Sequence, residues 1–143
     1  MPLKINVKSG EKFVVNGAVM VAGNKGASLV LQNEATILLG KDVMQEREAN
    51  TPSRRIYFSI LVMYLDQDNV NKYRDTFMSY VEDFMDATTF SEVRRTLLHI
   101  VEDVNSRNYY RAMKTCKVLM NYEDEMLKVG KTEAHLEVTD VRS

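Results

Sequence analysis

The sequence has few residues that constrain or interrupt a chain: its 143 residues include two prolines, six glycines and one cysteine. Tryptophan is absent. The single cysteine, Cys116, excludes an intrachain disulfide, and its place in a helical pattern predicts a packed thiol in a reducing compartment. The one long apolar run, Ile56 to Leu65, is interrupted by Ser59 and is about half of the roughly 20 residues that cross a bilayer. No secretory signal pattern is present at the N-terminus. We therefore expect a cytoplasmic protein without membrane association.

The composition is that of a globular chain, with 45% hydrophobic and 27% charged residues and a formal net charge of −1. This balance gives no global attraction to nucleic acid. The charge is uneven, however, because residues 1–45 carry five lysines against three acidic residues, which gives +2 and leaves −3 for the remainder. An anionic partner is therefore expected on the first third of the chain.

The first third predicts a small antiparallel sheet. Short β-rich runs are separated by turn signals, and Asn16-Gly17 is the preferred pair for a two-residue type I′ turn because both residues accept positive φ. Gly23-Asn24-Lys25-Gly26 predicts a second turn, and Phe13 is the single aromatic residue expected in the core of the sheet. The pattern indicates a meander of about five strands, over 4–8, 12–15, 18–21, 28–31 and 35–39.

Helical periodicity begins at residue 51. Thr51 as the cap and Pro52 at the first helical position predict a nearly all-apolar central helix that reaches Leu65. Amphipathic helices follow over about 69–86, 89–106 and 109–128, with a capping box at Thr89 and Glu92, Leu127 facing inward and Gly130 as the final stop. We predict an α+β fold with a β-rich subdomain (1–45), a connector (46–50), a four-helix subdomain (51–130) and a flexible tail (131–143).

Catalytic or metal-binding chemistry is not indicated. His99 and His135 have no second ligand at metal spacing, and the loop from Gly23 to Ser28 lacks the residue order of a phosphate-binding loop. The acidic clusters Glu82-Asp83, Glu102-Asp103 and Glu123-Asp124-Glu125 are typical of solvated helix faces. The sequence thus predicts a binding protein with no enzymatic activity, no metal and no cofactor.

The candidate site is a set of cationic side chains with one amide. Lysine and arginine could contact phosphates, and Asn24 could bond exposed bases of single-stranded RNA. Alternatively, the lysines guard the strand edges against aggregation, and no exposed aromatic residue offers itself for base stacking. The candidate RNA-binding residues are Lys4, Lys12, Asn24, Lys25, Lys41, Arg54 and Arg55.

Arg54 and Arg55 call for an anion, because two guanidinium groups near a helix N-terminus oppose the helix dipole. The partner is either a carboxylate of the protein, such as Asp42 or Glu46, or a phosphate bound in bidentate fashion.

Two sequence blocks resemble the FlbT family of flagellin regulators in alphaproteobacteria. Gly10-Glu11-Lys12-Phe13-Val14-Val15-Asn16-Gly17-Ala18-Val19 is one, and Thr51-Pro52-Ser53-Arg54-Arg55-Ile56-Tyr57-Phe58 is the other. Leu3-Lys4-Ile5 and Asp42-Val43-Met44 also fit. The resemblance implies a post-transcriptional repressor of flagellum biogenesis that binds the 5′ untranslated region of flagellin mRNA and promotes its decay, often opposed by FlaF. Some relatives favour flagellin production, so the sign of regulation stays open.

A second class of function also fits the chain. Helices rich in aromatic residues and methionine suit a chaperone-like protein that holds flagellin in a hydrophobic groove and affects the message indirectly. The expected partners are thus the flagellin mRNA leader, flagellin and FlaF.

The strands also resemble the carbon-storage regulator CsrA, in Gly10-Glu11 and in the loop from Gly23 to Gly26. Strand exchange would supply the core that the small sheet lacks, so we expect a homodimer through residues 1–45.

Overall fold

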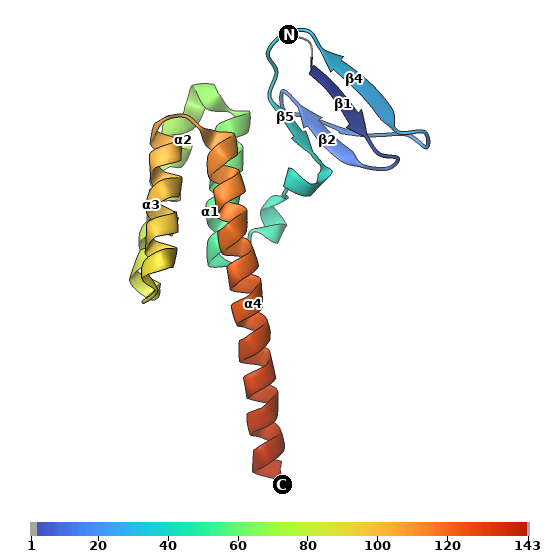
Figure 1. Ribbon diagram of the computed structural model, residues 1–143. Coiled ribbons are helices and arrows are strands. Elements are labelled where there is room, and N and C mark those ends of the chain that lie inside the picture. The colour runs from blue at the N-terminus through green and yellow to red at the C-terminus, as the bar shows by residue number, and fades with distance from the viewer. Residues whose placement is uncertain (1–2, 143) are drawn as a thin grey trace.

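Five strands precede four helices, which confirms the predicted α+β fold (Figure 1). The computed structural model describes the backbone of residues 3–142 and the side chains of residues 3–128. The strands are β1 (Leu3–Val7), β2 (Lys12–Val15), β3 (Ala18–Val21), β4 (Ala27–Leu31) and β5 (Ile37–Leu39). The helices are α1 (Pro52–Leu65), α2 (Val70–Ala87), α3 (Ser91–Asn105) and α4 (Tyr109–Arg142), with 3-10 turns at Gly40–Asp42, Glu46–Glu48 and Gln67–Asn69.

The strands form two antiparallel sheets, so the predicted meander is wrong in its topology. β1 pairs with β4, while β2 lies between β3 and β5. The predicted turn at Asn16-Gly17 is confirmed, with φ of 48° and 84°. Asn16 also explains the strand order, because its N–H donates to the Thr36 carbonyl at 2.8 Å and its Oδ1 accepts from the Thr36 N–H at 2.9 Å. These bonds bring β5 beside β2 and leave β1 and β4 to pair with each other.

The three-stranded sheet is a layer between two apolar cores. Side chains alternate across a strand, so Phe13 and Val15 face the β1–β4 sheet and Val14 faces the helices. Phe13 packs with Val7 and Ala22 in the smaller core, as predicted for the single aromatic residue of the sheet. Val14 and Leu38, by contrast, are part of the main helical core. The sheet is therefore attached to the helices through its own buried side chains.

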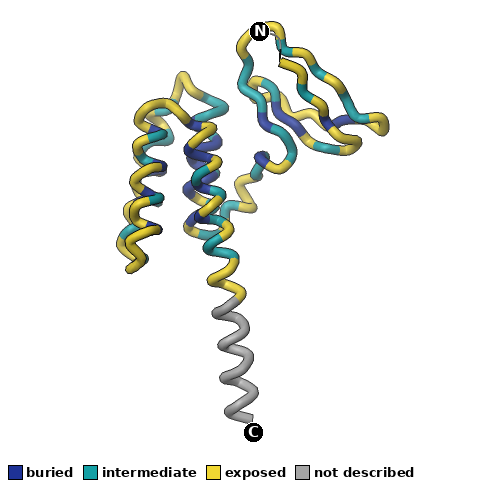
Figure 2. The backbone as a smooth tube through the Cα atoms, in the orientation of Figure 1, coloured by how far each residue is buried: buried dark blue, intermediate teal, exposed yellow. Residues whose placement is uncertain are grey.

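Helix α1 is the centre of the helical part, as its apolar sequence predicts. It packs against α2 and α4, while α3 packs against α4. Ile56, Ile60 and Met63 of α1 are fully buried, and dark blue follows this helix in Figure 2. The buried partners from the other helices keep the predicted spacing of three and four residues: Phe77 and Val81 of α2, Val93, Leu97, Ile100 and Val104 of α3, and Tyr109, Ala112, Met113, Cys116 and Leu119 of α4.

One of the two predicted helix caps is confirmed and the other is wrong. Thr51 Oγ1 accepts the N–H of Arg54 at 3.3 Å, with Pro52 in the first turn. Helix α3, however, begins at Ser91 after Phe90, and no side chain caps it. Phe90 occupies the N-cap, so Thr89 lies one residue before it and Glu92 is at the second helical position, where the two cannot form a capping box. The Arg94 guanidinium instead donates to the Thr88 and Met85 carbonyls at the end of α2.

Helix α4 does not end where the sequence predicts. Its backbone is helical through Gly130 to Arg142, because a glycine inside a helix costs only about 1 kcal/mol and does not have to terminate it. Leu127, expected inside, is 49% exposed. The side chains of 129–143, including His135, lie outside the described residues, and the flexibility of 131–143 stays a prediction.

We predict that Phe77→Ala lowers the free energy of unfolding by about 3–5 kcal/mol, because it removes a fully buried ring from the main core. Phe90→Ala is the matched control, since the ring of Phe90 is 53% exposed and its loss should cost less than about 1 kcal/mol. Urea unfolding followed by circular dichroism measures both. Equal losses would contradict the assignment of this core.

Candidate nucleic-acid interface

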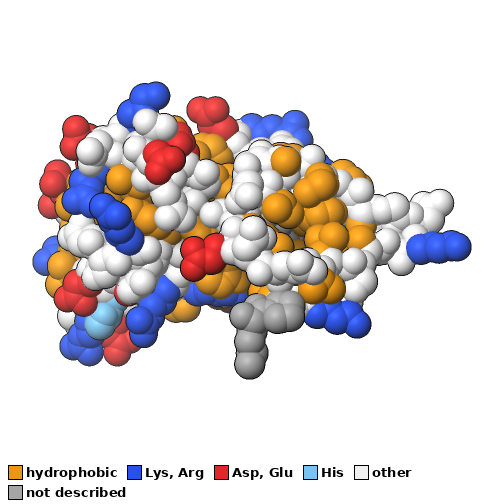
Figure 3. Space-filling view, turned by 90° about the horizontal axis from the view of Figure 1, so that it is seen from above, with side chains coloured by type: hydrophobic (Ala, Val, Ile, Leu, Met, Phe, Trp, Pro, Cys, Tyr) orange, Lys and Arg blue, Asp and Glu red, His pale blue; other side chains and the backbone are white. Residues whose placement is uncertain are grey.

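The structure spreads the seven sequence-predicted residues over several surfaces. Lys4 lies opposite Val30 on the β1–β4 sheet, and Lys12 lies opposite Val21 on the other sheet. Asn24 and Lys25 form the turn between β3 and β4, Lys41 lies in the turn Gly40–Asp42, and Arg54 and Arg55 lie in the first turn of α1. Figure 3 shows cationic groups at separate points around the outline of the sheet half, with an apolar area between them. No single basic stripe joins them on that face.

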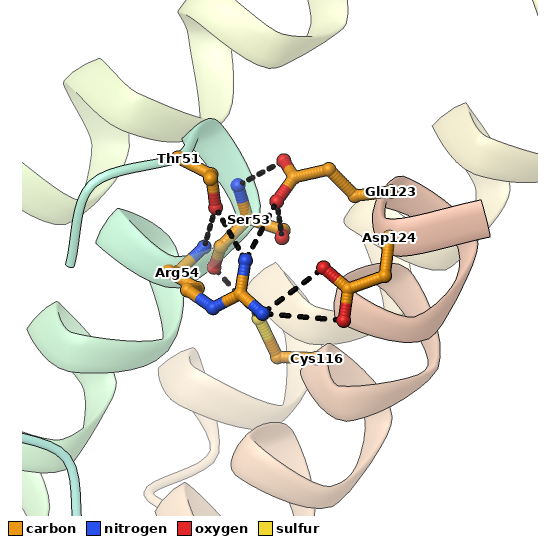
Figure 4. A network of polar contacts seen from close by, with 6 residues as sticks. All are labelled: Thr51, Ser53, Arg54, Cys116, Glu123 and Asp124. Carbon is orange, nitrogen blue, oxygen red and sulfur yellow. Dashed lines mark hydrogen bonds and ion pairs between the residues drawn. The ribbon is translucent and has the colours of Figure 1, made fainter. Parts of the chain in front are cut away.

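Arg54 has partners within the protein. Its Nη2 donates to both oxygens of Asp124, at 3.0 and 3.2 Å, and its Nη1 lies 3.7 Å from Glu123 Oε1 (Figure 4). The anions are thus carboxylates of α4, and the proposed partners Asp42 and Glu46 are wrong. Arg55 makes no ion pair within the described residues and is exposed, so it is the freer cation of the two.

Glu123 binds the start of α1 more tightly than it binds Arg54. The N–H and the hydroxyl of Ser53 donate to its two carboxylate oxygens at 2.9 and 2.7 Å. Ser53 is fully buried, and its N–H is one of the first-turn amides that lack a partner inside their own helix. Burial also raises the pKa of the nearby Cys116 thiol, whose Sγ lies 3.4 Å from the Ser53 carbonyl. The expectation of a solvated face is therefore wrong for Glu123, whose side chain is 11% exposed, whereas the Asp124 side chain is 40% exposed.

Asp42 is the buried carboxylate at the junction between the sheet and the helices. It is 4% exposed, and its side chain accepts from the Lys117 ammonium and, at 3.3 Å, from the Tyr110 hydroxyl. The Tyr57 hydroxyl donates to the Asp42 carbonyl at 2.7 Å. Burial, and secondly the Asp42 charge, raise the pKa of Tyr57 far above its usual value, so this hydroxyl stays protonated as a donor.

Tyr64, Tyr110 and Lys114 lie together on the outside of this junction. With Lys41, whose backbone is bound to α4, we call them the tyrosine–lysine patch. The rings of Tyr64 and Tyr110 lie 6.0 Å apart, and Lys114 Nζ lies 5.2 Å from the centre of the Tyr110 ring. The Lys41 carbonyl accepts from Lys117 at 3.2 Å, which places Lys41 beside α4. Tyr110 is 40% exposed. The patch therefore offers an aromatic surface next to cations.

The tyrosine–lysine patch opens onto a hollow between the sheet and the helices. A cavity of about 250 Å³ lies among Tyr64, Tyr110, Asp42 and apolar residues of β1, β4 and β5. A polar hollow of about 610 Å³ adjoins it, shares Tyr64 and has Gln32, Asn33 and Glu34 in its lining. Aromatic rings, cations and amides are the groups that bind single-stranded nucleic acid.

The sequence reached only Lys41 of this patch. Tyr110 follows Tyr109, which is buried, and their helical spacing gave no sign that Tyr110 would meet Tyr64. Lys114 lies between Arg111 and Lys117, three residues from each, in an otherwise acidic half of the chain. This cationic spacing was one usable signal, and the pair of neighbouring tyrosines at a helix start was another, because the second ring must point away from the face of the first.

The described residues contain neither a metal-binding cluster nor a membrane-spanning helix. No group of three or more histidine, cysteine, aspartate or glutamate side chains is placed to hold a metal ion. Among these residues, no helix combines the length and the apolar character required to cross a membrane.

Comparison with known proteins places this chain in a class of flagellar proteins. The family model described as "Flagellar protein FlbT" matches residues 3–127. A relative from Caulobacter sp. (strain K31), named a probable flagellum biosynthesis repressor protein FlbT, is 42% identical over 89% of this chain and 97% of its own length. The flagellum biosynthesis repressor protein FlbT of Caulobacter vibrioides (strain ATCC 19089) is also 42% identical, over 89% and 90%. A relative from Brucella anthropi is 28% identical over 94% and 93%.

The chain belongs to the FlbT family, as its two sequence blocks indicated. No solved structure matches it.

We predict that Glu123→Ala costs about 1–3 kcal/mol of the free energy of unfolding, because it leaves the buried N–H and hydroxyl of Ser53 without an acceptor. The matched control is Asp124→Ala, which removes an ion pair whose acidic side chain is 40% exposed and should cost less than about 1 kcal/mol. Chemical denaturation of the two variants measures the difference. A larger loss in Asp124→Ala would show that the ion pair, and not Ser53, is the main link between α1 and α4.

Proposed function

We propose that this protein is a post-transcriptional regulator of flagellum biogenesis that binds single-stranded RNA in the 5′ untranslated region of flagellin mRNA and promotes decay of the message. Membership of the FlbT family, whose relatives are named flagellum biosynthesis repressors, supports the regulatory role. The observation that carries the RNA step is the tyrosine–lysine patch, where Lys114 lies over the exposed ring of Tyr110 and Tyr64 borders a polar hollow.

The chemistry of the patch suits RNA in three ways. The ring of Tyr110 can stack on a base, and such contacts are worth about 1–3 kcal/mol each. Lys41 and Lys114 can contact the phosphates on either side, and Tyr110, followed by Asp42, raises the pKa of Lys114, which stays charged at neutral pH. Gln32 and Asn33 can bond base edges in the hollow. Of the seven residues predicted from the sequence, Lys41 takes part directly.

We expect Tyr110→Ala to weaken binding of the flagellin leader by roughly 5-fold to 100-fold, because a stacked base loses its platform. Tyr110→Phe keeps the ring and should bind nearly as the wild type does, and Phe90→Ala, an exposed aromatic at the far end of the helical part, should not weaken binding. Fluorescence anisotropy of the labelled leader RNA at two salt concentrations measures all four proteins.

Salt adds an independent control. Lys114→Ala should reduce the slope of log affinity against log salt by about 0.7, the value for one phosphate contact on a single strand, and Lys72→Ala on the exposed side of α2 should not. Binding that is equally strong in Tyr110→Ala would remove the tyrosine–lysine patch from the RNA site. Absence of any salt-sensitive binding would remove the RNA function itself.

A second candidate function, capture of flagellin as a chaperone-like protein, is favoured by an apolar groove on the helices. Hollows of about 330 and 530 Å³ meet at Phe90, Tyr122 and Met126, where the end of α2, the start of α3 and the middle of α4 converge. Their shared lining is aromatic and aliphatic, which suits the apolar face of a helix. Arg55 lines the smaller of the two hollows.

The two functions make opposite demands on two exposed aromatic residues. If the groove binds flagellin, Phe90→Ala should weaken flagellin binding at least tenfold in calorimetric titration and leave RNA binding intact, whereas Tyr110→Ala should do the reverse. A charge reversal at Arg54 is a poorer choice, because Arg54 holds α1 to α4. Flagellin binding that neither substitution changes would exclude the groove as its site.

A further inference from the structure

Strand β3 is an open sheet edge without the usual protection. It lies at one end of the order β3-β2-β5, and all four of its side chains, Ala18–Val21, are exposed and apolar. Val19 and Val21 are 65% and 60% exposed. Natural edge strands are normally shielded by charge, proline or a covering element, because free amides and carbonyls recruit another strand. This edge is shielded by none of these within the described residues.

The free backbone groups of β3 belong to Val19 and Val21. Across the two-residue turn, Val15 pairs with Ala18 and Phe13 pairs with Met20, so the N–H and C=O groups of Ala18 and Met20 point toward β2. Ala22 continues this alternation, since its carbonyl accepts from Gly10 and its N–H donates to Glu11, both at 3.0 Å. Val19 and Val21 therefore direct their amides and carbonyls outward.

The sequence around β3 is the same in both directions. Asn16-Gly17-Ala18-Val19-Met20-Val21-Ala22-Gly23-Asn24 is a palindrome centred on Met20 and contains no charged residue. A two-fold axis through Met20, normal to the sheet, pairs each residue with its own kind in a second copy: valine with valine, alanine with alanine and glycine with glycine. No like charges meet, and every side chain faces one of equal volume.

We infer that β3 pairs antiparallel with β3 of a second copy of this chain, with Met20 on the two-fold axis. In this register Val19 of each copy exchanges hydrogen bonds with Val21 of the other, which makes about four bonds and joins the two three-stranded sheets into one of six. The two outward-facing valines of each strand then form one apolar cluster on one face. In this register the free backbone groups of both Val19 and Val21 bond to the second copy. A register that paired Val19 with Val19 of the second copy would place only one of these two residues at the centre of the strand pair.

The helices do not block this pairing, but the small area of the strand pair limits its strength. β5 is the strand next to the helical part, and β2 separates it from β3 (Figure 1). A four-residue strand pair covers less than the roughly 1,200–2,000 Å² of a standard stable interface. The dimer is therefore expected to dissociate in the micromolar range.

Sedimentation velocity across the micromolar range tests the surface. The wild type should pass from monomer to dimer with concentration, and Val19→Lys should weaken dimerisation at least tenfold by placing charge on the edge. Val30→Lys is the matched control, since Val30 is 56% exposed on β4, away from the β3 edge. A wild type that stays monomeric at several hundred micromolar, or dimerisation that Val19→Lys does not weaken, would overturn the proposal.

Cross-linking tests the register without disturbing charge. Only position 20 meets its own copy, so oxidised Met20→Cys should give a disulfide-linked dimer, while Val19→Cys alone should not and should cross-link with Val21→Cys when the two are mixed. Cys116 is fully buried and does not interfere. Stronger self-cross-linking of Val19→Cys than of Met20→Cys would overturn the register.

Discussion

The fold depends on a buried charge, the carboxylate of Asp42. An ionised group that is 4% exposed is stable only when it is paired and hydrogen-bonded, and here the partners come from different parts of the chain. Lys117 and Tyr110 of α4 bind its side chain, and Tyr57 of α1 binds its backbone carbonyl. The last turn before the connector is thus tied to two helices at once, and the position of the whole sheet follows from that attachment.

This attachment explains why so small a sheet is stable. The core between the two sheets contains three buried residues, Val7, Phe13 and Ala22, which is too little for an independent domain. Val14 and Leu38 turn the other way and enter the helical core. The two parts therefore share buried side chains, and the cavity beside Tyr64 and Tyr110 is lined by residues of both.

Local patterns predicted the elements well and the connections between them poorly. The turn at Asn16-Gly17, the cap at Thr51 and the buried stripes of the helices follow from short-range chemistry that the sequence displays. The pairing of β1 with β4 does not, because it depends on the hydrogen bond between Asn16 and Thr36, 20 residues away.

The candidate site could be predicted only in part, for the same reason. Lys41 could be found by its charge, but Tyr64, Tyr110 and Lys114 become a site only when α1 and α4 lie side by side. Likewise, Glu123 was predicted to be solvated because no residue near it in the sequence indicates its contact with Ser53, 70 positions earlier.

The order of the three-stranded sheet separates its two edges by role. β5 lies at the junction that holds the tyrosine–lysine patch, and β3 lies on the other side of β2. Association through β3 would leave the tyrosine–lysine patch open in both copies and would make the assembly bivalent.

Two segments of one leader RNA could then bind with avidity, since the second contact occurs at a high effective concentration set by the RNA between them. A leader with two accessible single-stranded stretches would be retained far longer than either stretch alone, and dwell times on RNAs with one and two such stretches would measure that gain. Selectivity for a message could in this way arise from the spacing of weak sites in the RNA, without a highly specific contact to any one base.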